Sequence, residues 1–557
     1  MLHGRGGAGK SRLQWEIGLA AQQAGWRVWL LDAHLAQPDQ LTEALREPCT
    51  HPTLLLMDYI ERCDSWDNWL YALQAAADQG ARVHLLGACR NSWLERLDPW
   101  QTAQLALPDV QPDTVQGILR QRDGLLDFAE VCGGVPVFAV FLCLLADQQR
   151  HAELSALRGA PDFRRWLSVH LARLPDGQPE DMAGLVELLI SLPSHDAARQ
   201  ALEAATPSAS RYRRQLEDGG WLLETPYAPP DERWSTLHDV LADGALLNWL
   251  HTTPARIANG QVQRWLHAAA ARGQLRTQLR SWQRVAAEAS VQALDWPTLL
   301  TPPAEHADVW HAAHDAILNS GLLTPLAALR WLAARHPDPH HAASTPAVHL
   351  AVANAAKAWQ THPAQTPADH AMLIGWLDAL SATLTGHGAP APVLLGNHAL
   401  VQALHCDPAR YADAALSWLA QHHEQEQAQF LLNAWLKHHR HPAIAANGQY
   451  WLRRHGHKPV ASFVLKAWLD AGGEFSQVEE AALAWLAQHG TAAEARFVLK
   501  AWLDAGGEFS QVEEAALAWL AQHSTAAEAC FVLKAWLDAG GEFSQVEKAA
   551  LAWLAQH

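Results

Sequence analysis

The sequence lacks any apolar run of the ~18 residues needed to span a bilayer, and no signal-like segment precedes its first motif. Its seven cysteines are scattered without a CxxC pair, which argues against structural zinc and disulfides and favours a reducing cytoplasm. Basic residues number 41 against 58 acidic ones, and the formal net charge of −17 disfavours a nucleic-acid or membrane surface. We therefore expect a cytoplasmic globular protein without membrane or nucleic-acid partners.

The composition is instead rich in apolar residues, tryptophan and histidine. Apolar residues make up 49% of 557, enough to build cores in three to five domains of roughly 100–200 residues each. Many of the 32 histidines gather in stretches such as "QHH" and "KHHRH" near expected helix ends, without a fixed ligand spacing. These clusters therefore do not predict a metal site.

The clearest motif stands at the start, in "GRGGAGKS" from Gly4 to Ser11. Its glycines let the backbone N–H groups wrap a phosphate chain, and the helix expected over 11–25 adds its positive end. Lys10 would reach the β- and γ-phosphates, and Ser11 would supply a hydroxyl to Mg²⁺. The predicted nucleotide-binding residues of this loop are Gly4, Arg5, Gly6, Gly7, Ala8, Gly9, Lys10, Ser11 and Arg12.

A phosphate-binding loop normally follows a buried strand of about five apolar residues. Here only Met1, Leu2 and His3 come first. We expect a shortened central strand and a weakened sheet edge around residues 1–3, unless other elements compensate.

Three apolar runs, "WRVWLLDAH", "TLLLMDYIE" and "ARVHLLGACR", are typical of buried parallel strands. Asp58 follows the second run, where a carboxylate beside the loop serves Mg²⁺, so Ser11 and Asp58 are the predicted metal ligands. Alternating strands and helices predict a parallel sheet with helices on both faces.

Two further residues complete the predicted catalytic set of Asp58, Glu61 and Arg90. Many P-loop ATPases carry a second acid directly after the first, but Tyr59 stands at that position. Glu61 is the nearest residue that could orient water, or else it is a solvated loop acid. Arg90 ends the third strand and would distinguish ATP from ADP, or else it is a surface arginine.

The next motifs resemble those of the STAND class of P-loop NTPases, which contains the NB-ARC and NACHT proteins. "CGGVPVFAVFLCLLA" resembles the GxP motif of that class, and the resemblance implies that Pro136 packs near the adenine. Residues 210–250 have the helix–strand–loop–strand–helix pattern of a winged helix. Within it, "LHD" resembles the MHD motif, which implies that His238 contacts the ADP β-phosphate and holds a closed form. The alternatives are a plain helix start, with proline in its first turn, and an ordinary histidine at a strand end.

The last part of the chain is a helical repeat. "FVLKAWLDAGGEFSQVEEAALAWLAQH" starts at Phe463 and again at Phe497, and a near copy starts at Phe531, a period of 34. Ser476-x-x-Glu479 and Thr491-x-x-Glu494 read as capping boxes, and a double glycine ends a helix in each copy. Helix pairs of this kind bury their apolar faces by stacking into an α-solenoid. Its tryptophans form the core between repeats or, alternatively, an aromatic row that binds a ligand.

The predicted fold is therefore multidomain: an α/β P-loop NTPase domain, then helical and winged-helix domains, then an α-solenoid. The predicted boundaries are 1–122 for the P-loop NTPase core with a truncated first strand, 123–185 for the helical GxP-type domain, 186–255 for the winged helix, 256–410 for irregular helices and 411–557 for the tetratricopeptide-like repeats.

The resemblance implies a nucleotide-switched signalling ATPase with ATP or ADP and Mg²⁺ as cofactors and slow hydrolysis. An unknown protein or small-molecule ligand on the repeats would trigger ADP-to-ATP exchange and homo-oligomerisation, in bacterial defence against phage or in stress signalling. Its effector domain would lie N-terminal or on a separate chain. The alternatives are a helical-repeat scaffold with a vestigial nucleotide site and an AAA-like motor or chaperone.

Overall fold

The computed structural model falls into two compact units, Met1–Trp331 and Leu332–His557. The finer domain boundaries remain predictions. Within the described part of the chain, no helix is long and apolar enough to cross a membrane. The structure describes residues 1–4, 6–31, 51–60, 69, 73, 82–91, 93, 104–107, 112–147, 154, 157, 179–218, 220–224, 233–236, 238–303, 306–342, 345–361, 366–385, 393–438, 442–471, 475–526 and 528–556.

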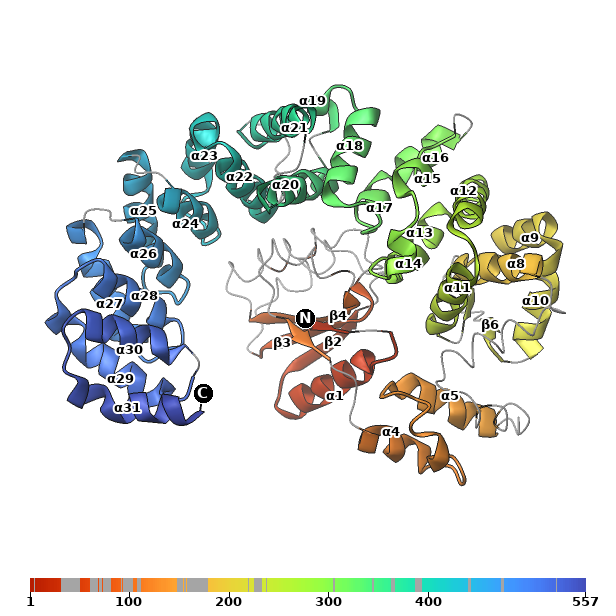
Figure 1. The fold of residues 1–557 in the computed structure, drawn as a ribbon, viewed down its shortest axis with the longest axis horizontal. Helices are drawn as coiled ribbons and strands as arrows, with labels where there is room; N and C mark the ends of the chain where they lie inside the picture. Colours follow the sequence, from red (N-terminus) through yellow and green to blue (C-terminus); the bar gives the residue numbers. More distant parts are fainter. Residues whose placement is uncertain are drawn as a thin grey trace. The chain divides into compact units, whose positions relative to one another are not determined.

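The first unit begins with the parallel sheet that the apolar runs predict (Figure 1). Its strand order is β2-β3-β4-β1-β5, so the strand before the phosphate loop lies between two partners. The strands are β1 (Leu2–His3), β2 (Arg27–Leu31), β3 (Thr53–Met57), β4 (Val83–Cys89) and β5 (Leu105–Ala106). The five residues of β3 are all buried, as expected for a strand covered on both faces.

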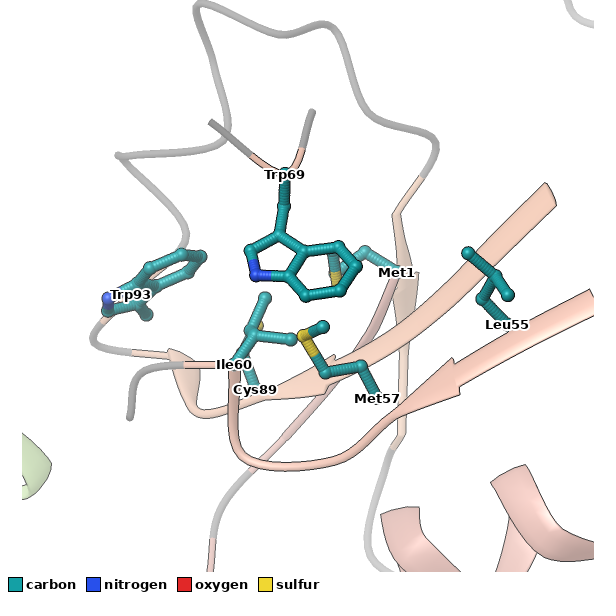
Figure 2. Close-up of a cluster of buried hydrophobic side chains, with 7 residues drawn as sticks. All are labelled: Met1, Leu55, Met57, Ile60, Trp69, Cys89 and Trp93. Atoms are coloured by element: carbon teal, nitrogen blue, oxygen red, sulfur yellow. The ribbon is translucent and has the colours of Figure 1, made fainter. Parts of the chain in front are cut away.

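The shortened central strand expected at residues 1–3 is present, and neighbouring elements compensate for its length. Strand β1 is short, but it is central: Leu2 pairs with Ala88 of β4 on one side and with Leu105 of β5 on the other. Met1 also lies in a buried cluster (Figure 2). This cluster contains Met1, Leu55, Met57, Ile60, Trp69, Cys89 and Trp93. Apolar packing therefore supplements the few hydrogen bonds of the short strand.

Gly87 makes room for that packing. A Cβ at this position would lie 2.6 Å from the Met1 Sδ, closer than any van der Waals contact. Below the loop, helix α1 (Lys10–Gln23) is tied to the sheet because Gln14 Nε2 donates to the carbonyl of Leu86 at 2.5 Å. The packing of Met1 before the loop and the hydrogen bond of Gln14 after it therefore anchor both ends of the loop between β1 and α1.

Helices and a small hairpin follow the sheet in the first unit, and the last helix, α18, continues past the end of this unit at Trp331. The predicted helix–strand–strand–helix pattern is present as α10, β6, β7 and α11, with β6 and β7 antiparallel. The elements are α4 (Pro112–Leu119), η3 (Leu126–Phe128), α5 (Pro136–Asp147), α8 (Pro179–Ile190), α9 (Asp196–Ala205), α10 (Pro207–Asp218), β6 (Leu222–Glu224), β7 (Trp234–Thr236), α11 (Val240–Thr252), α12 (Ala255–Ala271), α13 (Leu275–Arg284), α14 (Ala289–Gln292), α15 (Trp296–Leu299), α16 (Ala307–Ala312), α17 (His314–Leu318) and α18 (Pro325–Arg335).

The second unit is helical, and its last part consists of stacked helix pairs (Figure 1). Helices α24, α26, α28 and α30 each pack on the next, which is the expected α-solenoid arrangement. The elements are α19 (Pro339–Ala342), α20 (Pro346–Thr361), α21 (Pro367–Thr385), α22 (Val393–Cys406), α23 (Pro408–His422), α24 (Ala428–His438), α25 (Pro442–His455), α26 (Ala461–Asp470), η6 (Phe475–Gln477), α27 (Glu479–His489), α28 (Ala495–Asp504), η7 (Phe509–Gln511), α29 (Glu513–His523), α30 (Ala529–Asp538) and α31 (Phe543–Gln556).

Tryptophan and histidine join successive repeats in a constant pattern. In each of three repeats the rings of a Trp and of the His four residues later are in contact, and both donate N–H bonds to backbone carbonyls in the loop of the preceding repeat. The bonds are Trp451 to Gln425 (3.0 Å) with His455 to Glu424 (2.9 Å), Trp485 to Lys458 (2.8 Å) with His489 to His457 (2.8 Å), and Trp519 to Ala492 (2.8 Å) with His523 to Thr491 (2.9 Å). These histidines are structural.

Burial decides the role of the repeat tryptophans. Eight of them are at most 2% exposed: Trp418, Trp435, Trp451, Trp468, Trp485, Trp502, Trp519 and Trp536. They therefore form the core between helices and not a row that binds a ligand.

The predicted helix ends are partly wrong. Ser476 lies in the 3₁₀ turn η6, and Val478 is the N-cap of α27 without a side-chain bond. Helix α28 begins after Glu494, again without a side-chain cap, so neither capping box forms. The glycine end predicted at Gly472 and Gly473 lies outside the described residues. In the next two copies the glycine ends form, since Gly506 and Gly540 have φ of 76° and 88°, in the left-handed region.

Candidate functional site

The phosphate loop has the backbone that its glycines predict. Gly7 and Gly9 have φ of 78° and 91°, values that only glycine adopts readily. Gly9 is the N-cap of α1, so the positive end of the helix begins at the loop. Lys10 Nζ donates to the carbonyl of Gly4 at 3.0 Å, which keeps the ammonium group folded back over the loop.

One pocket of about 620 Å³ collects most of the predicted site residues, a volume typical of small-molecule sites. Its lining includes the predicted residues Gly6, Gly7, Ala8, Gly9, Lys10, Ser11, Arg12, Asp58, Arg90, Pro136 and His238. Arg5 and Glu61 lie outside the residues that the structure describes. The lining also includes five residues that the motifs did not predict, namely Tyr59, Ile118, Gln121, Val137 and Val140.

Asp58 lies directly after β3, as predicted, and lines the same pocket as Ser11. Its Oδ1 accepts the N–H of Tyr59 at 2.9 Å, and Tyr59 has a left-handed φ of 50°. A hydroxyl and a carboxylate are oxygen donors that suit Mg²⁺. The described residues hold no group of three or more His, Cys, Asp or Glu that would bind a metal by themselves. Any Mg²⁺ here would therefore need the nucleotide phosphates and water as further ligands.

The GxP segment packs directly on the phosphate loop. Pro136 is the first residue of α5, and the N–H of Val137 donates to the carbonyl of Gly7 at 3.3 Å. A Cβ on Gly7 would lie 2.2 Å from Val137 Cγ1, so only glycine fits beside α5. The GxP segment therefore contacts the phosphate loop directly and also lines the pocket.

His238 lies at the start of α11 and reaches the pocket from the winged-helix segment. Its Nδ1 lies 3.2 Å from the N–H of Val240 and 2.8 Å from Asp239 Oδ1. The ring packs edge-to-face with Phe141 of α5, with centroids 6.3 Å apart. These contacts fix the imidazole plane on the side of the pocket lined by α5.

Arg12 and Arg90 differ in how they are held. The Arg12 side chain is 77% exposed and pairs with Glu16 on the same helix. Arg90 is buried and pairs with Asp239 and, at 2.7 Å, with Asp243. The alternative interpretation of Arg90 as a surface arginine is therefore wrong.

Asp239 is ionised in this environment. Burial alone would raise the pKa of this carboxyl, but Arg90, His238 and Arg284 outweigh burial and hold the pKa well below its ordinary value. Motif reasoning named Asp239 only as part of "LHD" and missed Asp243 and Arg284. Asp243 follows Asp239 by one helical turn, a spacing that places both on one face. No sequence signal marks Arg284.

The chain was compared with family models, curated proteins and solved structures. No protein-family model matches the sequence, and no curated protein matches it. Among solved structures, the chain is similar to a Signal Transduction ATPase with Numerous Domains (STAND) protein with a tetratricopeptide repeat sensor from Pyrococcus horikoshii. The two chains share 11% identity with a TM-score of 0.30, and the match covers 100% of this chain and 93% of the other. At that score the similarity assigns no role to any residue, so each role depends on the geometry above.

Proposed function

We propose that this protein is a nucleotide-switched signalling ATPase that binds ATP or ADP with Mg²⁺ in the pocket of its first unit. One observation carries the proposal: the phosphate loop, the acid after β3, the proline of α5 and the histidine before α11 all line a single pocket. These residues come from four separate segments within the first 238 residues of the chain. Their convergence is what a nucleotide site needs and what an isolated glycine-rich turn lacks.

Each group has a distinct task in the proposal. The loop N–H groups and Lys10 bind the phosphates, and Ser11 and Asp58 hold Mg²⁺, which would neutralise charge on the phosphate oxygens. Pro136 packs against the base, and His238 contacts the β-phosphate of ADP. Tyr59 occupies the position of a second acid, so hydrolysis is slow and resets the switch. Glu61 remains the candidate that orients water, and Arg90 remains the candidate that senses ATP.

The output of the switch follows from the two units. A protein or small-molecule ligand on the helical repeats would favour exchange of ADP for ATP, provided that it binds the two states with different affinity. The ATP-bound form would self-associate and act through an N-terminal or separate effector, in bacterial antiphage defence or stress signalling.

The test uses two variants, Lys10→Ala and His238→Ala. Nucleotide retained by the purified protein is measured after denaturing extraction, and mass is measured by light scattering with ADP and with ATP. We expect wild type to retain ADP, Lys10→Ala to lose it and His238→Ala to assemble more readily. A wild type that carries and binds no nucleotide would contradict the proposal and support the scaffold. Fast multiple turnover would support the motor instead.

A further inference from the structure

Four charged side chains form a buried network beside the phosphate loop. Arg90 follows β4, Asp239 and Asp243 stand on the first turn of α11, and Arg284 ends α13. Arg284 Nε lies 2.7 Å from Asp243 Oδ1 and 3.8 Å from Asp239 Oδ2. The exposed side-chain fractions are 8% for Arg90, 11% for Asp239, 9% for Asp243 and 12% for Arg284.

The network is balanced in charge, with two cations and two anions. A buried ion whose partner is removed is strongly destabilised, because the lost Coulomb attraction no longer offsets its desolvation. The two aspartates share Arg90 between its Nη1 and Nη2 atoms, and they share Arg284 as well. Loss of Arg90 from the aspartates would therefore leave two carboxylates facing one arginine.

Arg90 is also in contact with the phosphate loop. A Cβ built on Gly6 would lie 2.8 Å from Arg90 Nη1, so the guanidinium packs against the loop backbone. Arg90 lines the same pocket as Lys10 and Gly9. An additional phosphate dianion at this end of the pocket would compete with two carboxylates for the same guanidinium.

We infer that Arg90, Asp239, Asp243 and Arg284 form a latch that opposes ATP more than ADP and that couples the phosphate loop to α11 and α13. The inference rests on the proposed nucleotide binding and extends it to Asp243 and Arg284. In the latched state Arg90 holds α11 against β4. A γ-phosphate draws Arg90 away from the aspartates, and the contact between α13 and α11 through Arg284 then changes with it.

The variants Asp243→Asn and Arg284→Met weaken the latch without touching a residue that lines the pocket. Asp243→Asn keeps the side-chain shape, and Arg284→Lys restores the charge as a rescue variant. The readout is the ratio of the dissociation constants for ADP and ATP, measured with fluorescent analogues of both nucleotides. We expect both variants to shift the ratio toward ATP by on the order of tenfold, with partial return in Arg284→Lys.

The chain offers a matched control in Arg272→Met. Arg272 pairs with Glu187 at 3.1 Å, and these side chains are 7% and 8% exposed, but neither lines the pocket. This variant should lower the unfolding temperature as the latch variants do while leaving the nucleotide ratio unchanged. Thermal unfolding of each variant separates stability from nucleotide preference.

Three outcomes decide the inference. A shift of the ratio in the latch variants and not in the control supports it. A ratio that stays within about twofold in all variants, in a protein that binds both nucleotides, overturns the latch and leaves the proposed function standing. A wild type that binds neither nucleotide overturns both.

Discussion

The two units of this protein differ in how buried their ion pairs are and in how far apart in sequence the paired residues lie. In the first unit, the ion pairs of Arg90 with Asp239 and Asp243 are buried and join residues 149 and 153 positions apart. In the repeats of the second unit, ion pairs such as Lys500–Asp504 are exposed and lie one helical turn apart. Bonds between repeats recur at separations of 26 to 32 residues.

This difference predicts which property a substitution in each unit should affect. The pocket of the first unit depends on single contacts between distant segments, and these contacts are not repeated elsewhere among the described residues. The repeats depend on nearest neighbours, and each contact has an equivalent in the next repeat. Substitutions at the pocket should therefore alter function, whereas those in the repeats should alter local stability.

The largest expected effect is that of Trp485→Ala in the repeat core. This side chain is fully buried and donates to the Lys458 carbonyl, so its loss leaves a cavity and an unpaired acceptor. We expect a loss of roughly 3–5 kcal/mol in the stability of the repeats. Chemical denaturation followed by circular dichroism measures it. Nucleotide affinity is the control, and a large drop in that affinity would break the comparison between the units.

A smaller loss of stability with a larger loss of function is expected for Gly7→Ala. The added Cβ meets Val137 at a left-handed φ, so we expect a destabilisation of about 2 kcal/mol and a loss of nucleotide affinity of about tenfold or more. Binding of a fluorescent nucleotide and thermal unfolding measure the two effects. Gly117→Ala, in helix α4 with nothing within 4 Å of the added Cβ, is the matched control and should be neutral or slightly stabilising. Equal behaviour of the two variants would count against the loop geometry.

The repeats should also lose stability in mild acid. Burial lowers the pKa of His422, and burial is likewise the largest effect that lowers the pKa of His455. A lowered histidine pKa means that the unfolded chain binds the proton first. Stability should therefore be full above the unfolded value of about 6.5 and decline as the pH falls toward the folded values.

Thermal unfolding of the repeats between pH 8 and pH 5 measures this loss. His455→Gln should flatten the profile, and a profile that is flat in wild type would contradict it.

The smallest effect is expected for Lys500→Ala. Its ion pair with Asp504 is exposed, with 42% and 45% of the two side chains accessible. Solvent screens such pairs, so we expect a change of less than about 0.5 kcal/mol. Denaturation measures it beside Arg272→Met, whose buried pair should matter far more. Similar values for the two would remove the contrast between buried and exposed charge.

Sequence by itself determined the features that depend on local spacing. The loop glycines, the acid after β3 and the 34-residue period were readable because a turn, a strand end and a helix pair each need particular residues at neighbouring positions. The same holds for the buried tryptophans, since an apolar residue repeated on one helix face must find a core. Even the failed capping boxes were local errors of a few residues: Ser476 lies in a 3₁₀ turn, and α28 begins at Ala495 without a side-chain cap.

Tertiary structure decided the features that join distant segments. A central strand at residues 1–3 was expected from the loop that follows it, but no pattern in these residues identifies β4 and β5 as its two neighbours. Arg90 was visible as a strand-end arginine, but its two aspartates lie about 150 residues away. Asp243 and Arg284 look like ordinary helix residues in sequence, and they become a charge-balanced network only when burial removes water and each ion needs the others.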